Sequence, residues 1–246
     1  MIPLKDDNPH DRTPVVTLAL IAANLLAFAW QIDLRTLPDA LRGGELLLAM
    51  SARIQDTALR GGVVPFEILT FSDIELRDVV PPPFTLFTAM FLHGGVTHLA
   101  FNMLFLWIFG NNVEDALGRL RFLLFYLASG VVAALVQVVA SAVTGDIFVP
   151  MVGASGAIAG VLAAYMVLFP RARISTLVII VILIRVLPLP ARFFIGLWFA
   201  GQVFSVLLGA SNGVALFAHI GGFVAGWLLV RLVGRRTGWL ARRVVW

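Results

Sequence analysis

The chain has 246 residues, of which 60% are hydrophobic and only 13% are charged. Soluble domains of this length have about a quarter charged residues, so we predict that most of this protein lies in lipid. The formal net charge of +4 comes from basic residues grouped at the ends of apolar segments, a pattern typical of membrane topology and not of nucleic-acid binding. The absence of cysteine excludes disulfides, thiolate nucleophiles and Cys-ligated metals within this sequence.

Apolar segments of near-membrane length follow one another along the chain. They lie at 14–32, 96–112, 120–142, 155–169, 191–209 and 213–233. We therefore predict an all-α, multi-pass integral membrane protein built as a bundle of six transmembrane helices. Thr13 and Pro14 predict the start of the first helix, with Thr13 as its cap. The interrupted run 174–187 is expected to be an interfacial segment between the fourth and fifth helices.

The distribution of arginine and lysine orients the bundle. Placing both termini in the cytoplasm collects most basic residues inside, whereas the last two outer turns contain none. The expected organisation is a short cytoplasmic N-terminus (1–13) without a cleavable signal peptide, a membrane domain (14–233) and a basic cytoplasmic tail (234–246). The long outer loop 33–95 is either a partly structured element on the outer interface or a simple spacer. We expect the host membrane to be a prokaryotic plasma (inner) membrane.

Polar side chains inside three of the spans are expected to lie at one depth. Ser155 opens the fourth span, His219 lies in the first turns of the sixth, and His98 and Asn102 share one face of the second. All three spans start at the outer side, so these groups fall within roughly 10 Å of the outer boundary. Hydroxyl and imidazole groups are costly in hydrocarbon unless they find partners, and a serine paired with a histidine is a nucleophile with its base.

Glycines give the same spans a way to approach each other. Gly156 and Gly160 on the fourth span, and Gly222 and Gly226 on the sixth, form small-xxx-small pairs that allow close helix packing in lipid. His219 shares a face with the second pair. Ser155 lies at a helix N-terminus, where free backbone N–H groups favour a developing oxyanion.

Other interpretations of these residues stay open at this point. A serine in a membrane helix usually bonds back to a carbonyl, and a membrane histidine can be a haem ligand or a proton relay. His93 and His98 could by themselves indicate a metal, but the spans contain no acid to complete a metalloprotease HExxH motif. The soluble hydrolase motif G-x-S-x-G also fails, because position 157 is alanine.

From Pro82 to Arg236 the sequence resembles the rhomboid family of intramembrane serine proteases. The motifs are His93-Gly-Gly-x-x-His98-x-x-x-Asn102, Phe109-Gly-Asn-Asn-Val-Glu114-Asp-Ala-Leu-Gly118, Gly153-Ala-Ser155-Gly156 and Ala218-His219-x-Gly-Gly222. The resemblance implies a six-helix bundle whose Ser–His dyad opens to water on the outer side. It makes Ser155 the nucleophile and His219 the base and later the acid, with His98, Asn102 and the Ser155 N–H as oxyanion donors. The structural residues it implies are His93, Glu114, Gly118, Gly153, Gly156, Gly160, Gly222 and Gly226.

The sequence departs from the family pattern at two places, and it supplies no third acid for the dyad. The Trp-Arg pair of the first loop is replaced by Leu41-Arg42, and Ala159 occupies the position where some members place an aromatic against the catalytic histidine. The ring of His219 must therefore be supported by packing and hydrogen bonds. Phe217, Phe223 and Trp198 are the candidates.

The resulting expectation is a protease without cofactor or metal that cleaves single-span membrane proteins near the outer face. Because a spanning helix satisfies its own backbone hydrogen bonds, helix-breaking residues near the cleavage site should favour a substrate, and a small residue should fit beside Ser155. Lateral access past the fifth span is a further hypothesis. The alternatives are an inactive relative that escorts membrane proteins and a His-ligated haem or metal protein. The oligomeric state is not predicted.

Overall fold

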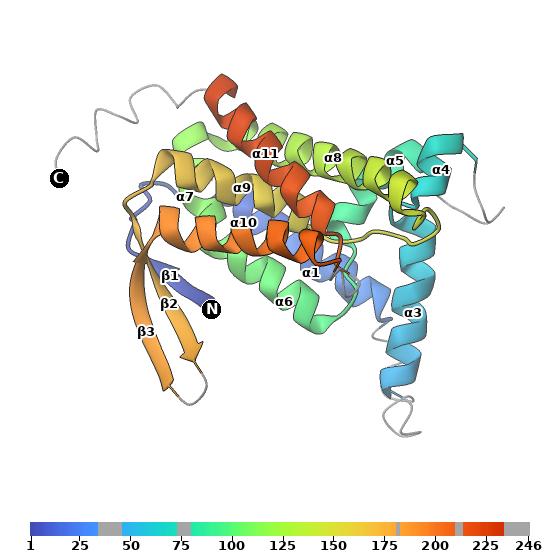
Figure 1. Ribbon diagram of the computed structural model, residues 1–246, viewed down its shortest axis with the longest axis horizontal. Coiled ribbons are helices and arrows are strands. Elements are labelled where there is room, and N and C mark those ends of the chain that lie inside the picture. Colours follow the sequence, from blue (N-terminus) through green and yellow to red (C-terminus); the bar gives the residue numbers. More distant parts are fainter. Residues whose placement is uncertain (34–45, 73–79, 181–182, 210–213, 234–246) are drawn as a thin grey trace.

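The computed structural model describes residues 1–33, 46–72, 80–180, 183–209 and 214–233. The pair Leu41-Arg42 and the predicted tail 234–246 lie outside these ranges. Most described residues are helical, and the helices form a bundle with a small sheet at one end (Figure 1).

The longer apolar helices of the bundle alternate in direction along the chain. In chain order they are β1 (Ile2–Asp6), α1 (Val15–Gln31), α3 (Leu46–Gly61), α4 (Pro65–Thr70), α5 (Pro82–Thr88), η1 (Ala89–Phe91), α6 (Val96–Phe105), η2 (Leu106–Gly110), α7 (Asn111–Leu117), α8 (Arg119–Thr144), α9 (Ser155–Leu168), β2 (Arg173–Ile180), β3 (Leu183–Pro190), α10 (Ala191–Leu207) and α11 (Leu216–Val233). Helices α6, α9 and α11 begin at the end of the bundle that carries α3, whereas α1, α8 and α10 begin at the sheet (Figure 1).

Within the described residues, two helices are long and apolar enough to cross a membrane by themselves, α8 and α11. A third candidate is the pair Pro82–Phe91 and Val96–Leu117, which is bent by 80°. Helices α1, α9 and α10 are apolar but shorter. All six predicted apolar segments are thus helical, with ends close to those expected from the sequence.

The second predicted span is a composite helix that extends further than expected. Helix α6 continues through a π-helical turn, η2, into α7, which ends at Leu117 instead of 112. Gly118 then has a φ of +87° and joins α7 to α8 directly. Because L side chains rarely adopt this conformation, glycine is the residue that permits so tight a joint.

A carboxylate from another helix caps the start of α1. Pro14 precedes the first helical residue, Val15, and no side-chain hydrogen bond caps the helix locally, so the predicted capping role of Thr13 is wrong. Instead, Glu114 on α7 accepts hydrogen bonds from the backbone N–H groups of Val16 and Thr17, at 3.0 and 2.7 Å. The buried carboxylate satisfies amides that the helix leaves unpaired and lies at the positive end of its dipole.

The sheet corrects the all-α prediction. Where the sequence suggests an interfacial segment, β2 and β3 form an antiparallel hairpin, and β1 pairs with β2 to give the order β1-β2-β3. The expected polar N-terminus therefore contains a strand. β-Branched residues favour β2, and Pro188 and Pro190 are tolerated because β3 is an edge strand. The far half of the hairpin extends away from the helices (Figure 1) and exposes Ile179, Ile184 and Val186.

A half-buried carboxylate attaches β1 to the bundle. Asp6 accepts hydrogen bonds from the Tyr165 hydroxyl at 2.6 Å and from the Asn112 amide at 2.8 Å. Burial of the carboxyl group raises the pKa of Asp6 above its ordinary value. The first strand is therefore an integral part of the sheet end and not a loose extension.

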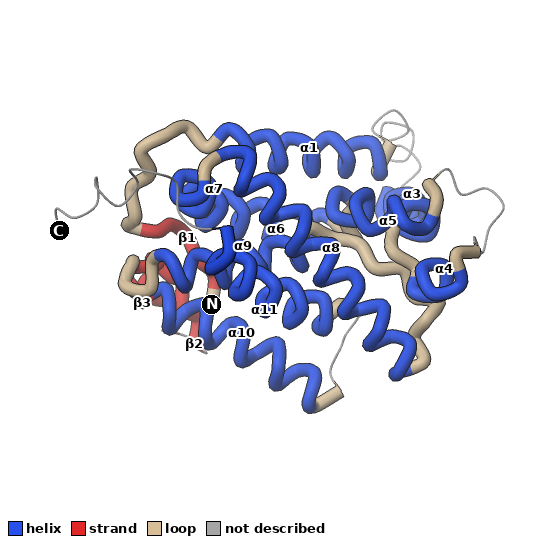
Figure 2. The backbone as a smooth tube through the Cα atoms, turned by 90° about the horizontal axis from the view of Figure 1, so that it is seen from above, coloured by secondary structure: helices blue, strands red, loops and turns tan. Residues whose placement is uncertain are grey.

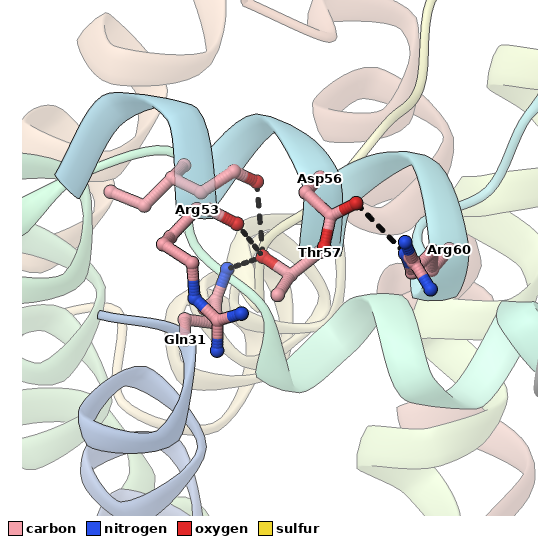
Figure 3. Close-up of polar contacts among 6 residues, drawn as sticks. Gln31, Arg53, Asp56, Thr57 and Arg60 are labelled. Carbon is pink, nitrogen blue, oxygen red and sulfur yellow. Dashed lines mark hydrogen bonds and ion pairs between the residues drawn. The ribbon is translucent and has the colours of Figure 1, made fainter. Parts of the chain in front are cut away.

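The described part of the long loop is helical, which excludes the simple-spacer interpretation for that part. Helix α3 runs across the bundle axis and appears nearly end-on when the view is rotated (Figures 1 and 2). It is attached to the end of α1 through Gln31, whose amide donates to the Thr57 hydroxyl at 3.0 Å (Figure 3). On the exposed side of α3, Arg60 and Asp56 form an i,i+4 ion pair at 2.8 Å.

Helix α9 is the centre of the bundle and is buried along almost its whole length. It packs against α8 and α11 through small residues. A Cβ on Gly156 would lie 2.6 Å from the Ala133 Cβ on α8. On α11, a Cβ at Gly222 would overlap the Gly156 carbonyl, and one at Gly226 would overlap the backbone of Gly160. The two helices therefore touch backbone to backbone, as the paired glycines predict.

Replacing Gly226 by alanine should separate α9 from α11. The added methyl overlaps backbone, which cannot move aside, so we expect destabilisation of about 1–3 kcal/mol. Denaturation of the purified protein in mixed micelles measures it. Gly196→Ala on α10 is the matched control, because nothing lies within 4 Å of its Cβ position. Equal stability of the two variants would contradict the backbone contact.

Candidate active site

Ser155 and His219 lie within hydrogen-bond distance. Ser155 is the first residue of α9, and His219 lies in the first turns of α11. The Ser155 Oγ and the His219 Nε2 are 2.8 Å apart. The glycine contacts bring these helix ends together, because they hold α9 and α11 at backbone distance one turn further into the bundle.

Gln202 on α10 occupies the other side of the His219 ring. Its Oε1 lies 2.8 Å from Nδ1. An amide oxygen carries no hydrogen, so this contact is a hydrogen bond only when Nδ1 is protonated. The Nε2 lone pair is then free to accept the proton of the Ser155 hydroxyl. The three side chains form one chain of hydrogen bonds in the order Ser155, His219, Gln202.

An indole supports the imidazole. The Trp198 ring lies 5.8 Å from that of His219 at an interplanar angle of 37°. Phe223 packs behind Trp198, with ring centroids 6.5 Å apart. Of the three aromatic candidates, Trp198 is thus the one with a ring contact to His219, and it does so from α10 and not from the position of Ala159.

His98 approaches the serine through a gap that only glycine provides. Gly153 has a φ of +126°, and a Cβ there would lie 2.7 Å from the His98 Cε1, 2.8 Å from its Nε2 and 3.7 Å from the Ser155 Oγ. The Gly94 N–H donates to the His98 Nδ1 at 3.3 Å, which leaves the proton on Nε2. His98 therefore presents an N–H beside Ser155.

Asn102 holds a second unused donor. It is buried one helical turn after His98, and its Nδ2 has no hydrogen-bond partner among the described residues. The amide of Ser155 belongs to the first turn of α9, whose N–H groups have no partner within the helix. A buried donor without a partner is costly, so the Asn102 amide is available to any acceptor that binds there.

Two further glutamines hold the backbone around these residues. Gln31 on α1 accepts from the His93 N–H at 2.8 Å and donates to the His93 carbonyl at 3.3 Å, and the His93 ring packs edge-on against His98 at 5.1 Å. Gln137 on α8 accepts from the Ala218 N–H at 3.2 Å, next to His219. The contacts of His93 are thus backbone hydrogen bonds to Gln31 and the packing of its ring against His98.

The described part of the long loop fixes the segment that leads to Ser155. Val63 and Met151 exchange two backbone hydrogen bonds of 2.9 and 2.8 Å, and the Gly153 N–H donates to the Ala89 carbonyl at 2.8 Å. These hydrogen bonds fix the position of the segment just before Ser155 relative to Val63 and Ala89. The loop thus has a structural connection to the site, which its sequence does not reveal.

A small cavity of about 20 Å³ lies beside Ser155. Its walls come from α5, η1, α8, the segment before α9, and the starts of α9 and α11, and most are small: Leu86, Ala89, Met90, Gly130, Ala133, Ala134, Met151, Val152, Gly153, Ser155, Gly156, Ala157, Ala215 and Ala218. Met90 closes one side, because a Cβ on Gly130 would lie 2.5 Å from its sulfur. The space accommodates one or two heavy atoms.

Two of the sequence-selected residues lie away from this site. Glu114 and Gly118 are at the sheet end of the bundle, where they cap α1 and join α7 to α8. Gly160 and Gly226 pack one turn below the serine.

Among the residues the structure describes, no three His, Asp or Glu side chains gather in a group that could hold a metal ion.

The Ser155 hydroxyl is hydrogen-bonded to an imidazole between apolar helices, and unused donors lie beside it. These features place the chain among integral membrane proteins with a serine–histidine site. A family model of the rhomboid domain matches residues 82–236. The chain belongs to the rhomboid family, whose members are mostly intramembrane serine proteases, and the resemblance seen in its motifs is confirmed.

Individual relatives cover different parts of the chain. It is 36% identical over 155 residues, 61% of its length, to the rhomboid protease GluP of Bacillus subtilis, and 33% identical over 185 residues, 71%, to RHOMBOID-like protein 4 of Arabidopsis thaliana. It is 39% identical over 85 residues, 35%, to the human mitochondrial presenilin-associated rhomboid-like protein. The matched regions span 26%, 41% and 22% of these relatives.

Gln202 is the site residue that sequence reasoning missed. A usable signal was present: Gln202 is one of three polar residues in the predicted span 191–209, the others being Arg192 and Ser205. The argument that selected Ser155 and His219, a polar group in an apolar segment, applies to Gln202 equally.

Replacing Gly153 by alanine should reduce turnover by displacing His98. The methyl group would lie 2.7 Å from the imidazole, so we expect a fall in kcat of about 10²-fold, as for the loss of one oxyanion donor. Gly145→Ala is the matched control, since Gly145 also has a positive φ, +91°, but nothing lies within 4 Å of its Cβ position. Initial rates of substrate cleavage compare the two. If both variants lose activity to the same extent, backbone strain and not the displacement of His98 accounts for the loss. If Gly153→Ala cleaves at the wild-type rate, the prediction is wrong.

Proposed function

We propose that this protein is a serine endopeptidase that cleaves single-span membrane proteins in or near their transmembrane segments. The observation that carries the proposal is the 2.8 Å contact between the Ser155 Oγ and the His219 Nε2, on helix ends lined by unused hydrogen-bond donors. The proposed architecture has six spans with both termini in the cytoplasm. The site then opens near the outer face of a plasma membrane.

In the first half of the reaction, the Ser155 Oγ attacks the scissile carbonyl carbon while its proton passes to the His219 Nε2. The carbonyl oxygen becomes an oxyanion, for which the His98 Nε2–H, the Asn102 amide and the Ser155 N–H are the proposed donors. The C–N bond then breaks, and the imidazolium returns the proton to the leaving amine. An acyl group remains on Ser155.

In the second half, water attacks the acyl carbon with His219 again as the base. The bond to Ser155 Oγ breaks, the hydroxyl regains its proton, and a carboxylic acid leaves. Each donor to the oxyanion typically lowers the barrier by a few kcal/mol, about 10²–10³ in rate. The reaction needs no cofactor, and the neutral Gln202 stands where soluble serine proteases have an acid.

Ser155→Ala and His219→Ala should each abolish cleavage of a single-span substrate in liposomes. Because the two residues act as a unit, the double variant should be no slower than either single one. Ser129→Ala, at another buried serine on α8, is the control and should cleave normally. Persistent cleavage by Ser155→Ala would reject the mechanism.

The same experiment separates the two other classes. An escort protein would bind the membrane substrate without cutting it and would behave identically with or without Ser155. A haem or metal protein would show a Soret band or bound metal in the purified sample, and chelation would stop its activity.

The cavity beside Ser155 favours a small residue on the acyl side of the cleaved bond. Its volume of about 20 Å³ fits the methyl of alanine but not a leucine or phenylalanine side chain. Changing alanine to leucine at this substrate position should lower kcat/KM by 10²-fold or more, by the clash with Ala133, Ala134 and Met90. Met90→Ala should recover part of that loss, and an unchanged preference would place the substrate side chain elsewhere.

Helix α10 is the proposed side of substrate access. Its only fully buried residues, Ala191, Phe194 and Ile195, lie in the first two turns at the sheet end. Further along, Gly196 and Gly201 have nothing within 4 Å of their Cβ positions. The outer half is therefore the less firmly packed part of the helix, and moving it exposes Ser155 to a helix arriving from the lipid.

A further inference from the structure

We propose that Gln202 is the positioning residue of the catalytic base, and that it makes the orientation of His219 dependent on the position of α10. This inference rests on the proposed protease function. It concerns a group that touches neither substrate nor the reacting atoms, and it assigns the role that the missing acid leaves open.

The first step is the tautomer. Ser155 can lose its proton to Nε2 only if Nδ1 carries the other hydrogen. The Gln202 Oε1 accepts that hydrogen at 2.8 Å and accepts nothing else in the described structure. Without this hydrogen bond, the tautomer that carries its proton on Nε2 would be equally available to the His219 ring, and that tautomer cannot accept the proton of Ser155.

The second step is the environment of the ring. The groups that face His219 are the Ser155 hydroxyl, the Gln202 amide, the Trp198 indole and the imidazole of His98, and none of them is an acid. An amide orients the ring without adding a negative charge. The positioning of His219 therefore depends on one neutral hydrogen bond and one ring contact.

The third step is that both supports belong to α10. Trp198 and Gln202 lie one turn apart on the face towards α11, and Phe199 stacks on Phe223 with centroids 4.2 Å apart. The fully buried anchors of α10 are all at the other end. Displacing the outer half of α10 thus removes the acceptor and the indole from His219 together, and its return restores both.

The consequence is that the base is correctly held only while α10 is packed against α11. A protein with α10 displaced can admit a substrate helix but has an unoriented base. Proton transfer begins when the helix has closed again over the bound segment.

The first experiment compares Gln202→Leu, Gln202→Glu and, as a control one turn away, Ser205→Ala. Gln202→Leu should lower kcat about 10²-fold with KM within twofold of wild type and with an unchanged melting temperature. Gln202→Glu keeps the acceptor and should restore most of kcat. Its added charge should shift the acidic limb of the pH–rate profile to higher pH.

Normal kcat and an unchanged pH profile in Gln202→Leu would overturn the proposal. A loss that the glutamate variant does not restore, accompanied by a lower melting temperature, would also overturn it in favour of a packing role. Failure of the protease function itself looks different, because the wild-type protein would then not cleave the substrate, or Ser155→Ala would cleave it equally well.

The second experiment tests the dependence on α10. The chain lacks cysteine, so Phe199→Cys with Phe223→Cys places a unique pair between α10 and α11. Once joined by a disulfide or a short bifunctional thiol reagent, the protein should react with a small soluble fluorophosphonate at the same rate as the unjoined double variant. Cleavage of a transmembrane substrate should fall at least tenfold and recover on reduction. Unimpaired cleavage by the joined protein would overturn the link to α10.

Discussion

The direct contact between the backbones of α9 and α11 determines the rest of the arrangement. No side chain separates Gly156 from Gly222 or Gly160 from Gly226, so the helices have a single possible spacing. That spacing brings the start of each helix, and hence Ser155 and His219, to 2.8 Å. In lipid, where apolar surfaces gain little by meeting each other, such close packing is a main source of helix association.

Hydrogen bonds from glutamine complete the site around this contact. Three of the four glutamines in the chain perform comparable tasks from three different helices. Gln31 holds the His93 backbone, Gln137 holds the amide before His219, and Gln202 holds the imidazole itself. A long neutral amide suits this purpose, because it satisfies buried polar atoms in the low-dielectric interior without the desolvation cost of a charge.

The sequence predicted those features that rest on local pattern. The apolar segments are helical, the glycine pairs meet, and Ser155, His219, His98 and Asn102 gather at one end of the bundle. Features that depend on distant partners were missed. The β1 strand forms because β2 offers it an edge, and α1 is capped by Glu114, which lies almost a hundred residues further along the chain. Trp198 was one of three aromatic candidates, and the structure is needed to select it as the ring that contacts His219. Hydropathy is also an average over a segment, so a single polar residue such as Gln202 is easily overlooked within an apolar span.

The unpaired amide of Asn102 has a consequence for inhibitors of such a site. In the resting protein this buried donor carries an unfavourable free energy, which any suitably placed oxygen relieves. Compounds whose warhead becomes a tetrahedral anion on Ser155 would gain that energy, whereas reversible ligands that merely fill the small cavity would not. Affinity should then follow the oxygen that a compound presents more closely than its apolar surface.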